Sequence, residues 1–390
     1  MVRPSKVVPG LLALLAVACS AGAPDPRRPP ETPAAARTSP PAGAPLPRLA
    51  AAGQTAATTV DVPAGSAAAG FLKGQTHVHT SGSYDAKTPP DRVLAFYAAR
   101  GYDFVAITDH NRVTVVAPPS GLLLVPGVEL TQNAATCTPA PPRGFRCLFH
   151  TSALFVDPAR DRYRGALFTL PFHPERVAAY SAHLAVSREL GGVAVVNHPH
   201  FHFAANADTI VALAQSGLRL LELSNAALDN QSPDGRAAAE RRNERLWDDV
   251  LSRGAEVYGL ATDDAHHFPG DGVTRIGNAL YSGDRGFIMV RAQKRIEAIR
   301  EAVLEGDFYA TTGVLVRELE TTREALRIAI NPVSGVSYTT RFVGRGGRVL
   351  AENSGPAVGY VPRGDEGYVR AVVAASSGEK AWIQPVFIGS

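Results

Sequence analysis

The sequence predicts an α/β fold built around a closed barrel, followed by a small all-β module. Two observations predict the barrel: apolar strand-like runs alternate with helix-period patterns after Phe71, and polar side chains gather where those runs end. A third observation predicts the module, because the segments after Gly313 are short, β-branched and separated by turn residues.

The barrel elements follow one another from Phe71 to Gly313. We expect strands at residues 71–78, 104–108, 122–130, 148–156, 193–197, 218–223, 257–262 and 287–290. We expect helices at residues 89–100, 175–190, 235–252 and 293–304. Alternation of this kind predicts a parallel sheet with crossover helices, and the number of repeats predicts that the sheet closes into a barrel.

The C-terminal module spans residues 314–390. Its expected strands lie at residues 325–330, 338–343, 348–352, 367–374 and 381–388. Because only short turns separate them, we expect these strands to be antiparallel. The sequence gives no indication of what this module does.

The N-terminus has the features of an export signal. Arg3 and Lys6 precede an apolar run at residues 7–17, which is too short to span a bilayer and typical of a signal peptide. Small residues before Cys19 resemble a bacterial lipoprotein signal, in which the cysteine becomes the acylated first residue. We therefore predict a signal peptide over residues 1–19 and a protein exported to the cell envelope, lipid-anchored to a bacterial membrane in the periplasm or at the cell surface. An ordinary secretory signal that contains a cysteine is the alternative.

Residues 20–70 are dominated by Pro, Ala, Gly, Thr and Ser. Such a segment cannot bury enough apolar surface to offset its ordering entropy, so we expect a disordered linker between the membrane anchor and the folded part. Export also affects the remaining cysteines, because disulfides form outside the cytoplasm. We expect Cys137 and Cys147 to form a disulfide, and two free thiols are the alternative.

The charge distribution argues against nucleic acid as a partner. The chain carries 39 Lys and Arg residues against 36 Asp and Glu residues, a net charge of +3, and the basic residues do not form a dense run. A surface that binds phosphate backbones needs clustered basic residues.

The polar residues at the strand ends are of the types that bind metals. His77 and His79 flank Val78, and side chains two residues apart on a strand share a face. The other candidate positions are Asp109, His110, Glu129, His198, His200, Glu222, Asn225, Asp263, Asp264 and His266. Because the carboxyl ends of parallel barrel strands are where such folds build their sites, the sequence predicts a metal centre there.

These motifs together resemble the polymerase and histidinol phosphatase (PHP) superfamily. The matching pieces are the His-x-His pair at 77–79, Thr-Asp-His at 108–110, Gly-Val-Glu at 127–129, His150, His198-Pro199 and Asp264-Ala265-His266. The resemblance covers about residues 71–313 and, within the superfamily, is closest to exported members grouped with carbamate-hydrolysing enzymes. It implies a distorted (β/α)7 TIM-like barrel with two or three divalent metal ions.

The resemblance also implies which residues hold each ion. The first ion would be held by His77, His79, Glu129 and Asp264. Glu129 would bridge to a second ion that is also held by His150 and His198, and Asp85, His110 and His266 would hold a third. Glu129, Asp264 and His198 are the residues expected to act directly in catalysis. Imidazole and carboxylate ligands suit zinc, manganese or iron without separating them.

The function expected from these residues is metal-dependent hydrolysis of a small-molecule ester, either a phosphate ester or a carboxyl or carbamate ester. A metal-bridged hydroxide would be the nucleophile. An amidohydrolase-type enzyme is one alternative, because that superfamily also opens with His-x-His, although no strand end here offers the lysine that it usually carboxylates. A non-catalytic surface metal-binding lipoprotein is the other alternative.

The lipoprotein signal leads to a first testable prediction. When the full chain is expressed in a bacterium, the mature N-terminus should be an acylated Cys19, which mass spectrometry of the purified protein will show. Cleavage at another bond, or an unmodified Cys19, would contradict it.

Overall fold

The structure is a computed structural model that describes residues 70–160, 169–230, 232, 234–270 and 283–389. The predicted signal peptide with Cys19, and all of the predicted linker except Gly70, lie outside the described residues. The described residues belong to one compact unit. No helix in the described ranges is long and apolar enough to cross a membrane.

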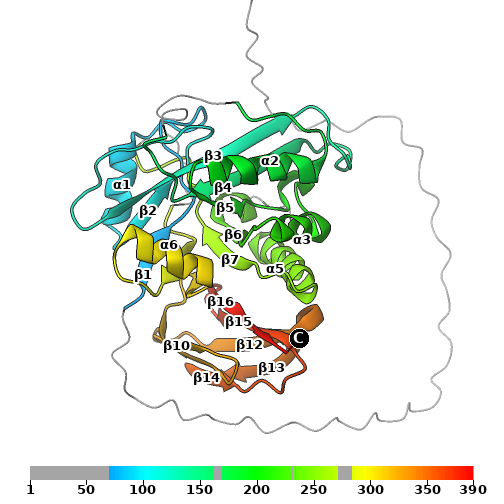
Figure 1. Cartoon of the computed structure of the whole chain (residues 1–390). Coiled ribbons are helices and arrows are strands. Elements are labelled where there is room, and N and C mark those ends of the chain that lie inside the picture. Colours follow the sequence, from blue (N-terminus) through cyan, green and yellow to red (C-terminus); the bar gives the residue numbers. More distant parts are fainter. Residues whose placement is uncertain (1–69, 161–168, 231, 233, 271–282, 390) are drawn as a thin grey trace, which may run out of the picture. The chain divides into compact units, whose positions relative to one another are not determined.

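The described chain folds as a mixed α/β structure with a large sheet and a small one (Figure 1). The strands of the first part are β1 (Leu72–Gln75), β2 (Phe104–Ile107), β3 (Leu123–Ala134), β4 (Cys147–Leu154), β5 (Val193–Val196), β6 (Leu220–Asn225), β7 (Tyr258–Thr262), β8 (Phe287–Val290) and β9 (Phe308–Thr311). The helices are α1 (Pro90–Ala98), α2 (Arg176–Glu189), α3 (Ala207–Gln215), α4 (Ala226–Asp229), α5 (Arg236–Ser252) and α6 (Ile296–Glu305), with a 3-10 turn η2 (Phe201–Phe203).

Strands β1 to β7 are neighbours in chain order, and the chain beyond β7 returns to β1. Val78, just after β1, forms a parallel bridge with Ala265, just after β7. The backbone N–H of His79 donates to the carbonyl of Ala265 at 3.0 Å, and that of Asp264 donates to the carbonyl of His77 at 3.0 Å. These bonds close the seven strands into a ring.

The ring is not parallel throughout, which corrects the expectation of a parallel sheet. The pairs β1–β2, β2–β3, β5–β6 and β6–β7 are parallel, but β4 is antiparallel to both β3 and β5. Strands β8 and β9 are also antiparallel to their neighbours. The direction of β4 follows from its connection to β3. No helix separates the two strands, and a strand that follows without a crossover connection pairs antiparallel.

Helix α3 was not expected from the sequence. Its first turn is fixed by Asn206, whose side-chain oxygen accepts a hydrogen bond from the backbone N–H of Thr209 at 3.0 Å. Asn is among the best residues for this capping position, so the cap was a readable signal. The helix buries Ile210 and Leu213 in the main hydrophobic core, against strands that include Leu220.

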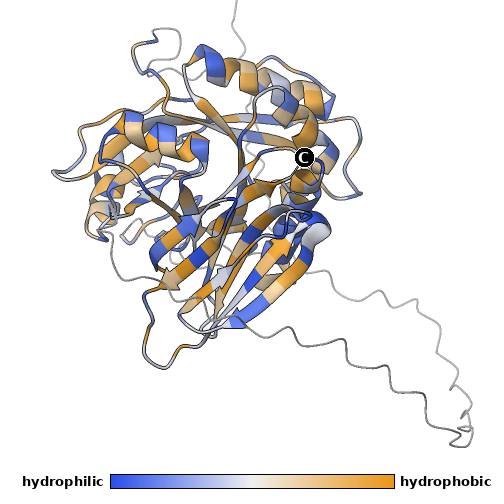
Figure 2. Ribbon diagram, turned by 60° about the horizontal axis from the view of Figure 1, so that its bottom comes forward, coloured by the Kyte–Doolittle hydropathy of each residue, from blue (hydrophilic) through white to orange (hydrophobic). Residues whose placement is uncertain are grey.

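The C-terminal strands are antiparallel, as expected, and four of them extend the large sheet. They are β10 (Val316–Thr321), β11 (Leu326–Ile330), β12 (Tyr338–Gly344), β13 (Arg348–Ser354), β14 (Ala357–Tyr360), β15 (Gly367–Ala375) and β16 (Lys380–Ile388), with a 3-10 turn η3 (Arg345–Gly347). Strand β16 pairs with β9, and β15, β12 and β13 follow outward, while β10, β11 and β14 form the small sheet. Figure 2 shows hydrophobic residues beside hydrophilic ones along these strands. The domain boundary at residue 313 stays a prediction.

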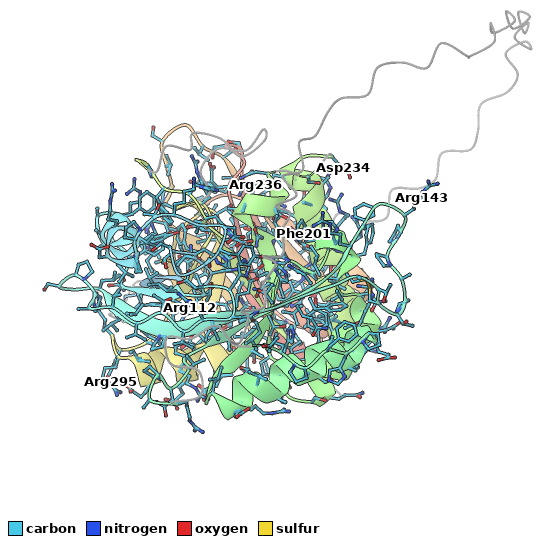
Figure 3. The ribbon with its side chains drawn as sticks, turned by 90° about the horizontal axis from the view of Figure 1, so that it is seen from above. Arg112, Arg143, Phe201, Asp234, Arg236 and Arg295 are labelled. Atoms are coloured by element: carbon cyan, nitrogen blue, oxygen red, sulfur yellow. A yellow bond between two sulfur atoms is a disulfide. The ribbon has the colours of Figure 1, made fainter. Side chains whose placement is uncertain are left out.

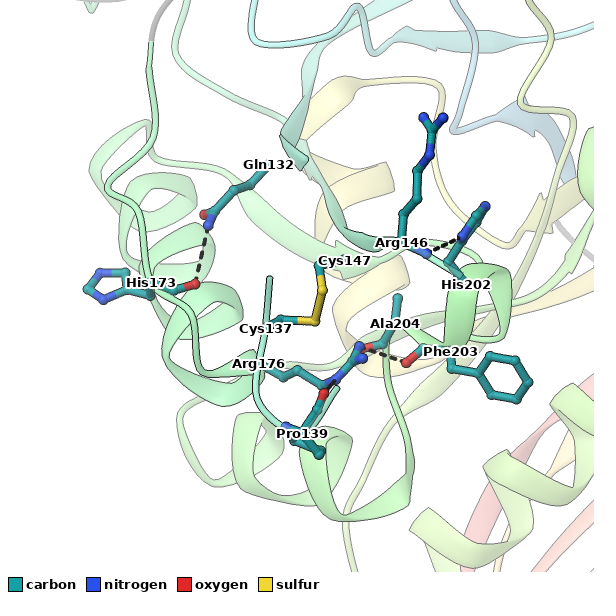
Figure 4. The surroundings of a disulfide bond; sticks show 10 residues. All are labelled: Gln132, Cys137, Pro139, Arg146, Cys147, His173, Arg176, His202, Phe203 and Ala204. Atoms are coloured by element: carbon teal, nitrogen blue, oxygen red, sulfur yellow. Dashed lines mark hydrogen bonds between the residues drawn. A yellow bond between two sulfur atoms is a disulfide. The ribbon is translucent and has the colours of Figure 1, made fainter. Parts of the chain in front are cut away.

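A disulfide joins Cys137 to Cys147, as the sequence predicted. It closes the loop between β3 and β4. Figure 4 shows how Arg176 holds this loop: its guanidinium donates to the carbonyl oxygens of Pro139 at 2.8 Å and Phe203 at 2.7 Å. The disulfide loop and the chain around η2 are therefore fixed to one another.

A buried ion pair joins helix α5 to the C-terminal strands. The guanidinium of Arg370 on β15 donates two hydrogen bonds of 2.7 Å to the two carboxylate oxygens of Asp248 on α5. The hydroxyl of Tyr368 donates to the same carboxylate at 2.7 Å. Arg370 is 2% exposed and Asp248 is 6% exposed. If one partner were removed, water could not solvate the charge that remains.

This pair predicts a large stability effect. Asp248→Asn leaves the guanidinium of Arg370 buried without a carboxylate, which should lower the free energy of unfolding by roughly 3–5 kcal/mol. Urea denaturation of the two proteins measures it. The matched control is Asp208→Asn, which removes an exposed ion pair with Arg253 and should change stability by no more than about 1 kcal/mol. Similar losses in both variants would contradict the prediction.

Candidate metal centre

The structure brings all nine predicted ligand residues to one end of the ring. His77, His79 and Asp85 follow β1, His110 follows β2, Glu129 lies in β3, His150 lies in β4, His198 follows β5, and Asp264 and His266 follow β7. They form three groups, two of which share His79, and within each group the possible ligand atoms all lie within 4.8 Å of one another.

The first group consists of His77, His79 and Asp264. The Nε2 atoms of the two histidines are 3.1 Å apart, and each is 3.2 Å from Oδ1 of Asp264. Two donors bound to one tetrahedral zinc ion at its usual bond lengths are separated by about 3.4 Å. The three atoms therefore have the spacing of ligands around one cation.

The second group consists of Glu129, His150 and His198. Oε1 of Glu129 lies 3.2 Å from Nδ1 of His150 and 3.5 Å from Nε2 of His198. All three side chains are buried.

The third group consists of His79, Asp85, His110 and His266. Oδ2 of Asp85 lies 3.3 Å from Nε2 of His110 and 3.4 Å from Nε2 of His266. The rings of His79 and His266 stack with their centroids 3.9 Å apart. Asp85 is exposed, with 37% of its side chain accessible, and the side chain of His266 is 19% accessible, so this group is more open to solvent than the other two.

Glu129 connects the three groups through its two carboxylate oxygens. Oε1 faces the second group and also lies 3.5 Å from Nε2 of His77. Oε2 lies 3.4 Å from Nε2 of His79 and 2.9 Å from Nδ1 of His110. A carboxylate in this position can bind two cations, one with each oxygen.

Most of the histidine rings are held by a hydrogen bond from the nitrogen that faces away from the neighbouring groups. The acceptors are Glu222 Oε1 for His77 at 2.6 Å, Ser83 Oγ for His79 at 2.9 Å, Asn133 Oδ1 for His150 at 3.1 Å and the Asp264 carbonyl for His266 at 2.9 Å. Such partners fix the tautomer and leave the other nitrogen free to bind a metal. His110 differs, because its Nδ1 lies 2.6 Å from Thr131 Oγ1 and also 2.9 Å from Oε2 of Glu129, while its Nε2 faces Asp85.

Glu222 is the functional residue that the sequence reasoning left without a role. Besides the bond from His77, its carboxylate accepts the backbone N–H of His198 at 2.7 Å and the hydroxyl of Thr262 at 2.9 Å. It therefore positions ligands from two different groups. Its place at the end of β6 was visible in the sequence, but nothing there showed that its partner would be His77.

Asp109 and Asp263 belong to none of the three groups, although each is next to a candidate ligand in the sequence. Asp109 accepts hydrogen bonds from Ser83 Oγ at 3.0 Å and from the backbone N–H of Thr80 at 2.7 Å, so it supports the loop that orients His79. Asp263 accepts the hydroxyl of Tyr97 at 2.8 Å and three backbone N–H groups at residues 284–286, which makes it a support of the loop before β8.

Two of the nine residues have strained backbones. His198 has φ of 26° and Asp264 has φ of 50°, values that non-glycine residues seldom adopt. Each such conformation costs on the order of 1–3 kcal/mol and is found mostly at functional sites. The turn after His79 has a related constraint, because a Cβ on Gly82 would lie 2.1 Å from Oδ2 of Asp109.

The charges in the centre depend strongly on one another. Burial acts to raise the pKa of Glu129, but the surrounding imidazoles, His110 first among them, hold it well below its usual range. Burial acts to lower the pKa of His110, but Glu129 and then Asp85 outweigh it and raise that pKa to about 10. Burial, followed by His266, lowers the pKa of His79 to about 4.

The residues present fit divalent cations. Among the described residues, the ion pairs of Glu129, Glu222, Asp85 and Asp264 are made with histidines and never with Lys or Arg. Buried carboxylates need a compensating charge, and a cation supplies it. Oδ1 of Asp264 is buried and has no aligned hydrogen-bond donor in the described structure, although two imidazole nitrogens lie 3.2 Å away. This nitrogen and oxygen donor set suits zinc, manganese or iron.

No protein family model matches the chain, and no curated protein sequence matches it. Among solved structures, an amidohydrolase from Chromobacterium violaceum, determined with bound sulfate and no metal, has a TM-score of 0.34 and 15% identity. The likeness covers 52% of this chain and 90% of that chain. A likeness of this degree does not assign a family or an activity.

The position of Glu129 predicts the metal content of a variant. Glu129→Gln keeps the size of the side chain but removes the charge that faces all three groups. It should therefore lower the bound metal by about one ion or more per chain, because a two-oxygen bridge serves more than one cation. Elemental analysis after reconstitution and removal of free metal measures it. The control is Glu301→Gln, at an exposed position on α6, and full metal content in Glu129→Gln would contradict the prediction.

The hydrogen bond between Glu222 and His77 predicts that a variant of Glu222 binds metal more weakly. Glu222→Gln keeps every ligand but weakens the hold on His77, and loss of such an orienting partner typically lowers metal affinity by about 10- to 100-fold. Competition with a chelator of known affinity measures the change. An unchanged affinity would mean that Glu222 does not orient His77 when metal is bound.

Proposed function

We propose that the chain is a metal-dependent hydrolase of the PHP type that acts on a small-molecule ester. The observation that carries this proposal is the set of three neighbouring groups of candidate ligands that the buried carboxylate of Glu129 connects. A pair of divalent cations in such a site lowers the pKa of a bound water and stabilises the negative charge that develops on the substrate. The protein's part is to hold the ligands in fixed tautomers, as the orienting bonds from Glu222 and Ser83 do.

The serine hydroxyl that contacts His79 does not have the hydrogen bonds of a nucleophile. Ser83 Oγ lies 2.9 Å from Nδ1 of His79 and donates its own proton to Asp109 at 3.0 Å. A serine nucleophile must instead give its proton to the histidine. The cysteines at 137 and 147 are in the disulfide. The arrangement therefore supports attack by water.

The lysines do not support the amidohydrolase alternative. Lys73 pairs with Asp284, Lys294 pairs with Asp103, and Lys380 pairs with acidic residues on α5. Lys87, the remaining lysine among the described residues, is exposed. None of them is available as a bridging carboxylated lysine beside the three groups.

A cavity beside the metal centre supports catalysis over simple metal storage. It has a volume of ≈ 590 Å³, and His198 forms part of its wall together with Phe145, Phe201 and Phe203. A protein that only sequesters metal has no need of a space of this size next to its ligands, whereas a hydrolase needs one for its substrate.

The charges around this cavity favour a carboxyl or carbamate ester over a phosphate ester. Arg242 is the cationic side chain among the described residues that line it, and its guanidinium donates to Asp234 at 2.6 Å and to Ser232 at 2.8 Å. Selective recognition of a phosphate group usually relies on Arg or Lys residues that are free to bind it.

We also propose that the enzyme works outside the cytoplasm, attached to a membrane through Cys19. The N-terminal signal pattern supports this, and so does the Cys137–Cys147 disulfide, because such bonds persist in oxidising compartments.

The proposed function predicts turnover that depends on both metal and Glu129. Protein reconstituted with zinc, manganese or iron should hydrolyse 4-nitrophenyl acetate or a phenyl carbamate faster than 4-nitrophenyl phosphate or bis(4-nitrophenyl) phosphate. Glu129→Gln should lower the rate by about a thousandfold or more, because charge stabilisation in the transition state is lost. Stopped assays of product release measure both effects.

The control and the contrary results are direct. Glu301→Gln should keep the wild-type rate and metal content. Fully reconstituted protein that hydrolyses none of the four substrates would contradict the hydrolase proposal. Faster cleavage of the phosphate esters would overturn only the choice of ester.

A further inference from the structure

We propose that Asp229 is the acid that protonates the leaving oxygen of the substrate and that the cavity beside His198 holds the leaving group; this inference rests on the hydrolase function proposed above. Asp229 and His198 line the same cavity, so one space of substrate size borders both this carboxyl and a candidate metal ligand. No role in metal binding accounts for a carboxyl there, since Asp229 belongs to none of the three ligand groups.

The cavity is mainly aromatic on the side next to the metal centre. The ring of Phe201 packs edge-to-face against that of His198, with centroids 5.3 Å apart, and Phe145 packs in the same way against Phe203 at 4.9 Å. Figure 3 shows Phe201 and Asp234 on the same side of the molecule, away from Arg295. Figure 4 shows Phe203 beside the disulfide loop that carries Phe145. A flat apolar group fits these walls better than a charged one.

Asp229 is tied to the metal ligands through a single residue. Its Oδ2 accepts the backbone N–H of Asn225 at 3.0 Å, and the side-chain amide of Asn225 donates to Asp264 at 3.1 Å and to Glu222 at 3.0 Å. Helix α4 has only one turn and is capped by Asn225, so these hydrogen bonds fix the position of Asp229 relative to the two carboxylates.

The charges that face Asp229 keep a proton available. Burial raises its pKa to about 7; Glu240 on α5 and Glu222 on β6 add to this, while the Asn225 N–H and Arg236 on α5 act against it. Arg236 is occupied by Glu240 at 2.7 Å, and no ion pair of Asp229 is formed within the described residues. An acid is most effective when its pKa lies near the working pH.

A buried acceptor without a hydrogen-bond partner also lines the cavity. Asn243 on α5 is 5% exposed and lines the cavity, and its Oδ1 has no hydrogen-bond partner within the described structure. Its amide donates to the carbonyl of Leu223 at 2.8 Å, so the side chain is held in place with a free acceptor. Buried acceptors of this kind usually have a partner, and a hydroxyl of the leaving alcohol would supply one.

The step balances as follows. A water molecule adds its oxygen to the acyl carbon, and the bond between that carbon and the leaving oxygen breaks with its electron pair on the oxygen. The carboxylic acid of Asp229 gives its proton to that oxygen, which departs as a neutral alcohol. The proton that the attacking water loses passes to solvent, and Asp229 recovers one from solvent. The overall reaction consumes one ester and one water and yields one acid and one alcohol.

Two acetate esters that differ only in the leaving oxygen test the proposal. Benzyl acetate releases a strongly basic alkoxide unless it is protonated, whereas 4-nitrophenyl acetate releases a stable anion that needs no proton. Asp229→Asn should lower kcat/KM for benzyl acetate by about a hundredfold or more and that for 4-nitrophenyl acetate by no more than about threefold. The wild-type rate on benzyl acetate should fall as pH rises through about 7, because Asp229 loses its proton, and the variant should lack that fall. Asp208→Asn, at an exposed position on α3, is the matched control and should leave both rates unchanged.

A readout without turnover comes from infrared difference spectroscopy. Wild-type protein should show a carboxylic-acid C=O band that titrates near pH 7 and is absent in Asp229→Asn. The metal content of the two proteins should be equal, which separates this role from one in holding the ligands.

The contrary outcomes are distinct. If Asp229→Asn lowers both rates equally, or neither, Asp229 is not the proton donor although the hydrolase proposal stands. If the titrating band is missing from wild type, Asp229 carries no proton to give and the inference is wrong. If reconstituted wild type cleaves neither acetate, the hydrolase proposal fails on these esters and the inference fails with it.

Discussion

The carboxylate of Glu129 is a negative charge that the fold buries almost completely. Many of the surrounding polar side chains compensate for this burial. The carboxylate is 1% exposed, and a charge so placed must be met by other charges or by hydrogen bonds. Five histidines approach its two oxygens from the chain after β1, β2 and β5 and from β4. These imidazoles in turn need partners for their second nitrogens, and Glu222, Ser83 and Asn133 are among the residues that supply them. One buried carboxylate thus accounts for two layers of polar side chains.

The sequence predicted the regular elements of the fold better than the contacts between side chains. The alternation of apolar runs predicted β1 to β7 and the long helices, and polar residues at the ends of those runs predicted a metal centre. The resemblance to the PHP superfamily supplied the full set of nine candidate ligands, including Asp85 and His150. The direction of β4 was missed because an apolar run is the same whichever way it points; only the missing crossover helix between residues 130 and 148 carried that information. The role of Glu222 was missed because a strand-end carboxylate does not reveal which imidazole it will meet. The cavity and Asp229 were missed because α4 is too short to show a periodic pattern of apolar residues in the sequence.

The disulfide loop and the loop after β5 together form one wall of the cavity beside His198. Arg176 on α2 binds the carbonyls of Pro139, Phe203 and Ala204, and the N–H of Arg146 donates to His202 at 2.8 Å. These bonds set two aromatic side chains from different loops, Phe145 and Phe203, against each other. The walls of the cavity therefore owe their spacing to backbone carbonyls held by one guanidinium and not to close packing of a continuous core.

The closure of the ring at Val78 and Ala265 has a consequence for how the protein comes into being. The ligands His77 and Asp264 stand beside that seam but come from opposite ends of the ring in sequence, and their approach requires every intervening strand to be in register. Contacts between such distant segments form slowly, because the entropy of closing the long intervening chain is lost before they are made. A fragment that ends before β7 would hold the histidine pair without the carboxylate of Asp264. The first group of candidate ligands is therefore complete only in a chain whose ring has closed.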